Sequence, residues 1–78
     1  MSTAENYLHD LGILIAENAR EAKRLRDQSQ HTDAYDYQLG YLMAYHEIVS
    51  IMQQQADIFD IARCKLGLAD LEPEIDLI

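Results

Sequence analysis

The sequence contains very few residues that interrupt helices. It has three glycines and one proline in 78 residues, and the proline, Pro73, lies close to the end of the chain. Residues 2 to 66 are therefore almost free of strong breakers, and this composition favours long helices. The alternation of apolar and polar residues that is typical of strands is also missing. We therefore expect an all-α protein.

Cysteine is equally scarce, since Cys64 is the single one and cannot form an internal disulfide. The start of the chain, Ser2 to Glu5, lacks the positive charge and apolar run of a secretory signal peptide. These two features predict a cytoplasmic protein. Arg63 and Lys65 flank Cys64 and would favour a reactive thiol. A buried or half-buried structural cysteine at the end of the second helix is the favoured interpretation, because no catalytic constellation surrounds it.

Positive charge and long apolar runs are in short supply as well. Six basic residues stand against 14 acidic ones, which gives a net charge of −8 and a pI of about 4.5. Such a chain is repelled by nucleic-acid phosphates, so we expect no nucleic-acid partner. The most apolar stretch, residues 39 to 45, falls far short of the roughly 20 residues that a membrane helix needs. We therefore expect no membrane partner, and the hydrophobic share of 49% excludes a disordered tail.

Two long helices are predicted from the periodicity. Ser2 followed by Glu5 has the spacing of a capping box, and Thr32 or Asp33 supplies a cap for the second helix. Apolar residues recur at steps of three and four in the first segment: Leu8, Leu11, Ile15, Ala19 and Ala22. We place the helices at about 4–28 and 34–62. The short polar connector makes them antiparallel neighbours, so residues 1–66 form a helical hairpin.

Residues 67–78 are predicted to form an acidic and aliphatic tail that packs on the bundle or extends from it. Gly67 ends a helical turn, since glycine tolerates the left-handed conformation found at helix ends. Four apolar residues of the tail are expected to lie on the bundle: Leu71, Ile75, Leu77 and Ile78. The basic residues Arg20 to Arg26 either form a solvated face of ion pairs with nearby carboxylates or receive the acidic residues 70–76 of the same or a second chain.

A row of tyrosines is the strongest signal in the sequence. Tyr37, Tyr41 and Tyr45 step by four along the second predicted helix, which is apolar over more of its circumference than one partner helix covers. The row has two interpretations. It either belongs to a bundle core whose hydroxyl groups reach solvent, or it is a recognition patch, because tyrosine is enriched in binding hot spots.

Small residues accompany the tyrosines. A glycine such as Gly40 destabilises a helix by about 1 kcal/mol relative to alanine. The preferred explanation for its presence is close approach by another helix, and the alternative is a neutral substitution that the protein tolerates. Asn18 lies on the edge of the first helix's stripe and either fixes the register of an interface or is an ordinary surface residue. The predicted interface consists of residues from the second helix: Tyr37, Gly40, Tyr41, Ala44, Tyr45, Ile48, Met52 and Phe59.

The sequence offers no metal site and no catalytic motif. His46 and Glu47 begin a zinc-binding pattern, but the second histidine that it requires is replaced by Ser50. No histidine follows a glutamate at the spacing found in di-iron bundles. We therefore predict a protein without catalytic residues, metal or cofactor.

Two helices alone leave one apolar side of the second helix uncovered. We expect two hairpins to pair into a four-helix bundle, since two-fold dimers are the commonest closed assembly. The predicted function is non-enzymatic: a homodimeric adaptor, inhibitor or regulatory module that acts through protein–protein contacts, with a second copy of itself as the expected partner and another protein as a further one. The alternative is a ligand- or metal-binding bundle with a pocket near His46 and Glu47.

Overall fold

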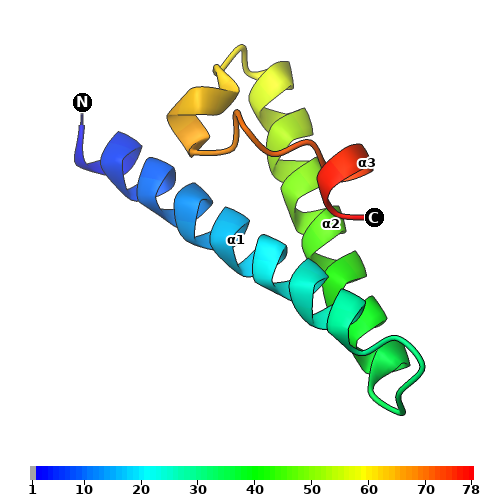
Figure 1. Ribbon diagram of the computed structural model, residues 1–78. Helices are drawn as coiled ribbons and strands as arrows, with labels where there is room; N and C mark the ends of the chain where they lie inside the picture. Colours follow the sequence, from blue (N-terminus) through cyan, green and yellow to red (C-terminus); the bar gives the residue numbers. More distant parts are fainter. Residues whose placement is uncertain (1) are drawn as a thin grey trace.

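The first helix begins where the capping residues predict it. The computed structural model describes residues 2–78, and its first helix, α1, spans Thr3–Gln28 (Figure 1). The hydroxyl oxygen of Ser2 accepts a hydrogen bond from the backbone N–H of Glu5 at 3.1 Å and donates to the Glu5 carboxylate at 3.2 Å. The cap satisfies a backbone donor that the helix itself leaves free.

A short turn reverses the chain into the second long helix, α2, which spans Tyr35–Ile58. His31 lies in the left-handed region at φ 67°. Thr32 does not cap α2 as predicted: Ala34 is the N-cap and has no side-chain cap bond, while the Thr32 hydroxyl accepts from the Ala34 N–H at 3.3 Å. Both long helices and the antiparallel hairpin are confirmed, and Figure 1 shows them diverging away from the turn.

The helix α2 ends at Ile58 and not near the predicted residue 62. Asp60 adopts the left-handed conformation at φ 57°. The Ile61 N–H donates to the Ala56 carbonyl at 2.8 Å, and the Asp60 N–H donates to the Asp57 carbonyl at 3.2 Å. This is the bonding pattern of a Schellman motif, for which glycine is the usual residue. Aspartate also tolerates this conformation. The helix therefore ends at a position without glycine, earlier than the predicted residue 62.

The returning chain forms a short 3₁₀ helix, η1 (Arg63–Leu66), that packs closely against α1. A Cβ atom on Gly12 would lie 1.4 Å from the carbonyl oxygen of Leu66. Gly67 ends η1 at φ 70°, as predicted, and a Cβ there would lie 2.7 Å from the His9 carbonyl oxygen. Two glycines therefore let backbone touch backbone, and η1 lies between the diverging ends of α1 and α2 (Figure 1).

Residues after η1 supply much of the core. The buried core residues of α1 are the alanines Ala16, Ala19 and Ala22, whose small side chains let neighbouring segments come near, and Leu8 and Ile15 pack partly against this core. The fully buried apolar residues outside α1 are Leu42, Val49, Ala56, Leu66, Leu68, Leu71 and Leu77. A second short helix, α3, spans Pro73–Asp76. The segment of residues 62–78, called here the C-terminal segment, is therefore an integral part of the fold.

The predicted contacts of this segment are correct for two residues and wrong for two. Leu71 and Leu77 are buried, whereas Ile75 and Ile78 remain 71% and 57% exposed. The difference arises because α3 is a single turn, and its exposed side carries Ile75 while Leu77 follows it into the core.

A buried glutamine ties α2 to the C-terminal segment. Gln53 is only 3% exposed, and its side-chain nitrogen donates to the carbonyl oxygens of Leu68 at 3.1 Å and Leu71 at 2.7 Å. Buried carbonyl groups need such partners because leaving them unpaired is unfavourable. The side chain of Gln53 therefore supplies the hydrogen bonds that water would otherwise donate to these two carbonyl groups of an irregular segment.

Basic side chains hold the same segment against α1. Arg20 donates to the Asp70 carbonyl at 3.3 Å, and both Lys23 and Arg26 donate to the Ile78 main-chain oxygen at 2.9 Å. The cluster also forms the ion pairs expected of a solvated face, including Lys23 with Asp27 at 3.4 Å. The cluster therefore forms the predicted solvated face of ion pairs. It also binds the C-terminal segment, but through main-chain oxygens of Asp70 and Ile78 and not through the predicted acidic side chains of residues 70–76.

One further ion pair links the end of α2 to the chain that follows it. The Arg63 guanidinium donates to Asp57 at 2.9 Å and lies 3.9 Å from Glu72. The hydrogen bond from Arg63 lowers the pKa of the Asp57 carboxyl below its usual 3.8. Because the folded pKa lies below the unfolded one, the pair stabilises the fold at neutral pH, and this contribution is lost as the pH falls through the folded value.

The two helical glycines give a matched test of the contact with η1. Gly12→Ala forces a Cβ atom into the Leu66 carbonyl, so we expect a loss of about 2 kcal/mol or more despite the better helix propensity of alanine. Gly40→Ala meets no atom within 4 Å and should stabilise the protein by about 1 kcal/mol. Urea denaturation followed by circular dichroism measures both, and equal effects would contradict the close contact.

The neighbouring glutamines give a second matched pair. Gln53→Ala removes the donor to two buried carbonyls, and we expect a loss of about 2–3 kcal/mol in the free energy of unfolding. Gln54→Ala removes the same atoms from an exposed position and should change stability by no more than about 0.5 kcal/mol. A Gln53→Ala variant as stable as the parent protein would show that the tether is unimportant.

Candidate functional site

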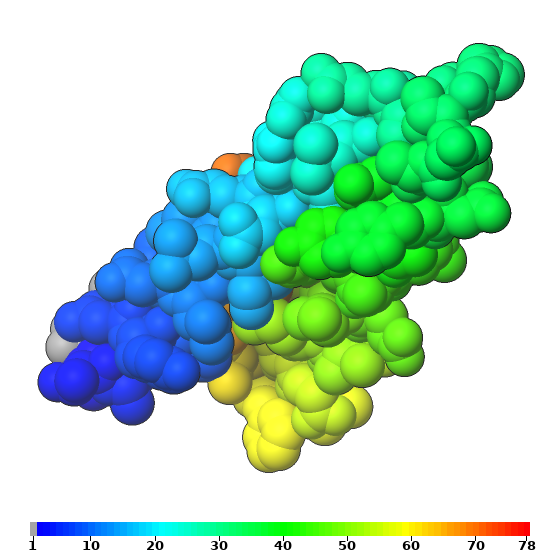
Figure 2. Space-filling model, turned by 90° about the horizontal axis from the view of Figure 1, so that it is seen from below, coloured from blue at the N-terminus to red at the C-terminus, as the bar shows by residue number. Residues whose placement is uncertain are grey.

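The hairpin has one covered face and one open face. The C-terminal segment covers one side of α1 and α2, and Figure 2 shows the other side, where the two long helices form nearly all of the visible surface. We call this side the open face. Its residues follow helical steps of three and four along each helix: Leu8, Leu11, Leu14, Ile15 and Asn18 from α1, and Tyr37, Tyr41, Tyr45, Ile48, Met52, Gln55 and Phe59 from α2.

The twelve residues of the open face are mostly apolar, and none of them is charged. Charged side chains border the face, since Glu21 follows Asn18 by one helical step and Glu5, Asp60 and Lys65 line a recess that shares Leu8 and Ile61 with the open face's own hollow. Leu14, Ile48 and Phe59 are exposed on it, while Leu8 and Met52 pack partly against the core. Large contiguous apolar surfaces of this kind mark contact sites in soluble proteins.

The predicted tyrosine row forms one half of the open face. The rings of Tyr37 and Tyr41 are stacked with centroids 6.3 Å apart, and those of Tyr41 and Tyr45 meet edge to face at 5.3 Å. Tyr45 packs against the core, whereas Tyr37 is 72% exposed. The row therefore begins at the core and runs outward into solvent. The core interpretation fits its inner end, whereas recognition of a partner by its exposed end stays a prediction.

The hydroxyl of Tyr45 affects the titration of Tyr41. Hydrogen bonding to the Tyr45 hydroxyl raises the pKa of Tyr41 above its usual 10.0. This interaction favours the protonated form of Tyr41. An uncharged Tyr41 suits burial against an apolar partner, because burying a charge is unfavourable.

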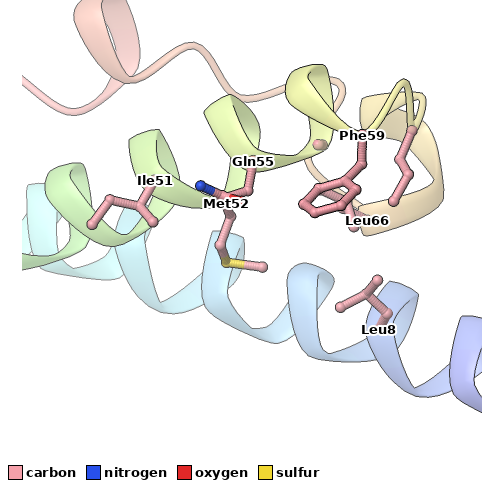
Figure 3. Close-up of a pocket in the computed structure, with 8 residues that line it drawn as sticks. Leu8, Ile51, Met52, Gln55, Phe59 and Leu66 are labelled. Atoms are coloured by element: carbon pink, nitrogen blue, oxygen red, sulfur yellow. The ribbon is translucent and has the colours of Figure 1, made fainter.

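The other half of the open face contains a hollow of about 260 Å³. It lies between the N-terminal half of α1 and the C-terminal half of α2, where the helices diverge and η1 forms the floor (Figure 3). Its lining residues are Leu8, Ile51, Met52, Gln55, Ala56, Phe59, Ile61 and Leu66. Figure 2 shows the hollow from outside. Of the predicted interface residues, only Met52 and Phe59 line it.

Sequence reasoning missed the hollow because it depends on where η1 lies. Leu66 reaches the floor only because Asp60 reverses the chain and Gly12 admits the backbone of η1. The recurrence of Leu8 within the α1 stripe was the one usable signal. It indicated that the residue faces a neighbour, although not which one.

The predicted close approach at Gly40 is not found within the chain. A Cβ atom on Gly40 would have no neighbour within 4 Å, and Ala44 is exposed. The tight contact occurs at Gly12 instead, because η1 and not a second helix is the element that comes near. Contact of Gly40 and Ala44 with another chain stays a prediction.

Polar candidates are separated from the open face. His46 Nε2 lies 3.5 Å from the Glu74 carboxylate on the covered side, and Glu47 is exposed. Cys64 is exposed within η1, so the prediction of a buried or half-buried cysteine at the end of the second helix is wrong. Across residues 2–78, no three or more His, Cys, Asp or Glu side chains are grouped to hold a metal ion.

Comparisons with protein-family models, with curated proteins and with solved structures find no match to this chain. None of the helices described for residues 2–78 has the length and apolar character needed to cross a bilayer. The open face, with its tyrosine row and its hollow, is therefore the feature on which a functional proposal can be built.

The effect of the Tyr45 hydroxyl on Tyr41 can be tested by titration. In Tyr45→Phe the hydroxyl that bonds to Tyr41 is removed, so we expect the pKa of Tyr41 to fall toward its usual value. Nuclear magnetic resonance of ring-labelled tyrosine follows each of the five phenols separately as the pH rises. Tyr7→Phe leaves the pair intact and should leave the Tyr41 titration unchanged. An unaltered Tyr41 titration in Tyr45→Phe would show that the two hydroxyls do not interact.

Proposed function

We propose that this protein acts without catalysis, through protein–protein contacts made by its open face, and that its first partner is a second copy of itself. Such a homodimer would serve as an adaptor, inhibitor or regulatory module. The observation that carries the proposal is the largely apolar surface that spans both long helices. Edges of that surface left exposed after pairing would bind another protein.

The amount of exposed surface supports this proposal. The chain exposes 5271 Å², whereas a compact monomer of its 9.0 kDa mass exposes about 4,850 Å². The two longest extents of the molecule are 45 and 21 Å, so its broadest side has a projected area of about 900 Å², close to the roughly 800 Å² that each partner contributes to a standard interface. An open face that spans this side would therefore be large enough for a stable dimer.

The architecture also favours a second copy as the occupant. A single layer of two helices buries only one side of each helix, and stable domains add a second layer against the other side. Here the C-terminal segment provides that layer on the covered face alone. Two hairpins joined by their open faces would form a four-helix bundle, in which each supplies the layer that the other lacks.

Ligand binding is a second candidate with one observation in its favour, the hollow. Its lining is almost wholly apolar, which suits a small apolar molecule. At about 260 Å³ it is smaller than the roughly 300–1,000 Å³ of most ligand pockets. The hollow is lined by neither His46 nor Glu47, the residues near which the sequence predicts a pocket. Native mass spectrometry of freshly purified protein would reveal a bound molecule or metal.

The dimer can be tested with one substitution in the open face and one outside it. Wild-type protein should show about twice its monomer mass of 9.0 kDa by light scattering at micromolar concentration. Ile48→Arg places a charge in the interface, where an unpaired buried charge is strongly unfavourable. We expect this variant to be monomeric, with the dissociation constant raised about 100-fold or more, equivalent to about 3 kcal/mol.

Met43→Arg is the matched control, because Met43 is 52% exposed and Ile48 is 44% exposed on different sides of the same helix. This variant should remain dimeric, and circular dichroism should show both variants folded. A wild-type protein that is monomeric and folded would contradict the proposal. Equal weakening by both arginines would show that a different surface is used.

A further inference from the structure

The two halves of the open face differ in shape. Tyr37 and Tyr41 are exposed on the N-terminal half of α2, and the hollow is recessed beside the C-terminal half of the same helix. Ile48 lies between them and is itself exposed. A surface with exposed side chains and a recess on opposite sides of one residue can pair with a copy of itself.

From this arrangement we infer that the two copies pair with their α2 helices antiparallel about a two-fold axis at Ile48, and that Tyr41 of each copy packs into the hollow of the other. The inference rests on the proposed dimer and names its register. In a two-fold interface, a residue ahead of the axis meets one equally far behind it. Tyr41 then lies opposite Gln55 of the second copy, and Tyr37 lies opposite Phe59 of the second copy.

The spacing along α2 fits this register. Tyr41, Ile48 and Gln55 are seven residues apart, as are Tyr45, Met52 and Phe59. A repeat of seven keeps one seam of a helix facing a partner helix over several turns. The seam therefore runs from the tyrosine row through Ile48 to the hollow without a break, and each copy offers the other the same seam in reverse.

The polar groups of the seam also match. A buried tyrosine hydroxyl usually finds a hydrogen-bond partner. Among the described residues that line the hollow, Gln55 has the one polar side chain, and it is the residue placed opposite Tyr41 by the axis. The phenol ring of Tyr41 would fill the apolar recess while its hydroxyl meets the Gln55 amide at the rim.

A parallel pairing lacks these advantages. It would place each tyrosine row against the other row and each hollow against the other hollow. The recess of about 260 Å³ would then stay unfilled in both copies, and unfilled apolar space in a packed interface is destabilising. Antiparallel pairing also sets the N-terminal end of each α2 beside the C-terminal end of the other, an arrangement that the helix dipoles favour.

Cysteine crosslinking tests the register. In a Cys64→Ser background, Ile48→Cys places the two introduced thiols at the axis, so oxidation should join the two copies. We expect this crosslink to form at least about tenfold faster than with Met43→Cys, because disulfides need Cβ atoms about 3.5–4.5 Å apart. All substituted side chains in this experiment are exposed in the single chain, and circular dichroism checks that each variant folds.

A mixture of two variants tests the direction of pairing. Tyr37→Cys mixed with Phe59→Cys should give a crosslinked heterodimer, whereas Tyr37→Cys alone should give none, since its two copies would lie about 33 Å apart along the helix axis. Self-crosslinking of Tyr37→Cys in a protein that is dimeric by light scattering would overturn the register and leave the proposed dimer standing. A monomeric parent protein would overturn both.

Discussion

The contact between the backbone of η1 and α1 is the constraint on which the rest of the structure depends. Gly12 has no side chain, so the Leu66 carbonyl can occupy the space where a Cβ atom would lie. This places η1 between α1 and α2 and holds their ends apart. The divergence produces the hollow, and the direction in which the chain leaves η1 places Leu68 and Leu71 in the core. One missing side chain thus governs both the fold and the candidate site.

Much of the architecture could be predicted because it depends on local patterns. The Ser2 cap, the three- and four-residue apolar steps of α1 and the polar connector specify the hairpin without knowledge of distant contacts. The end of α2 could not be predicted in the same way, because Asp60 takes a conformation that glycine usually occupies. The burial of Gln53 could not be predicted either. It is one of three adjacent glutamines, and it alone is buried because it lies on the same side of the helix as Val49 and Ala56.

The candidate site could be predicted in one half only. The tyrosine row depends on a repeat within one helix, so its position and stacking follow from the spacing of Tyr37, Tyr41 and Tyr45. The hollow is formed by three segments that are far apart in the sequence but meet in the fold. The periodicity of any one segment therefore cannot predict it. Gly40 was singled out because a helical glycine invites a contact, but the same physical signal was present at Gly12, where the contact lies.

The bonds between the C-terminal segment and α1 have a consequence for the order in which the chain folds. Arg20 reaches Asp70, and Lys23 reaches Ile78, across separations of 50 and 55 residues. Until residues 66–77 dock, the hairpin cannot bury the apolar side chains that these residues later cover. The face that the C-terminal segment later covers is then available for mispairing. Docking of residues 66–77 therefore determines that the open face, and not the covered face, is the apolar surface that stays exposed in the folded chain.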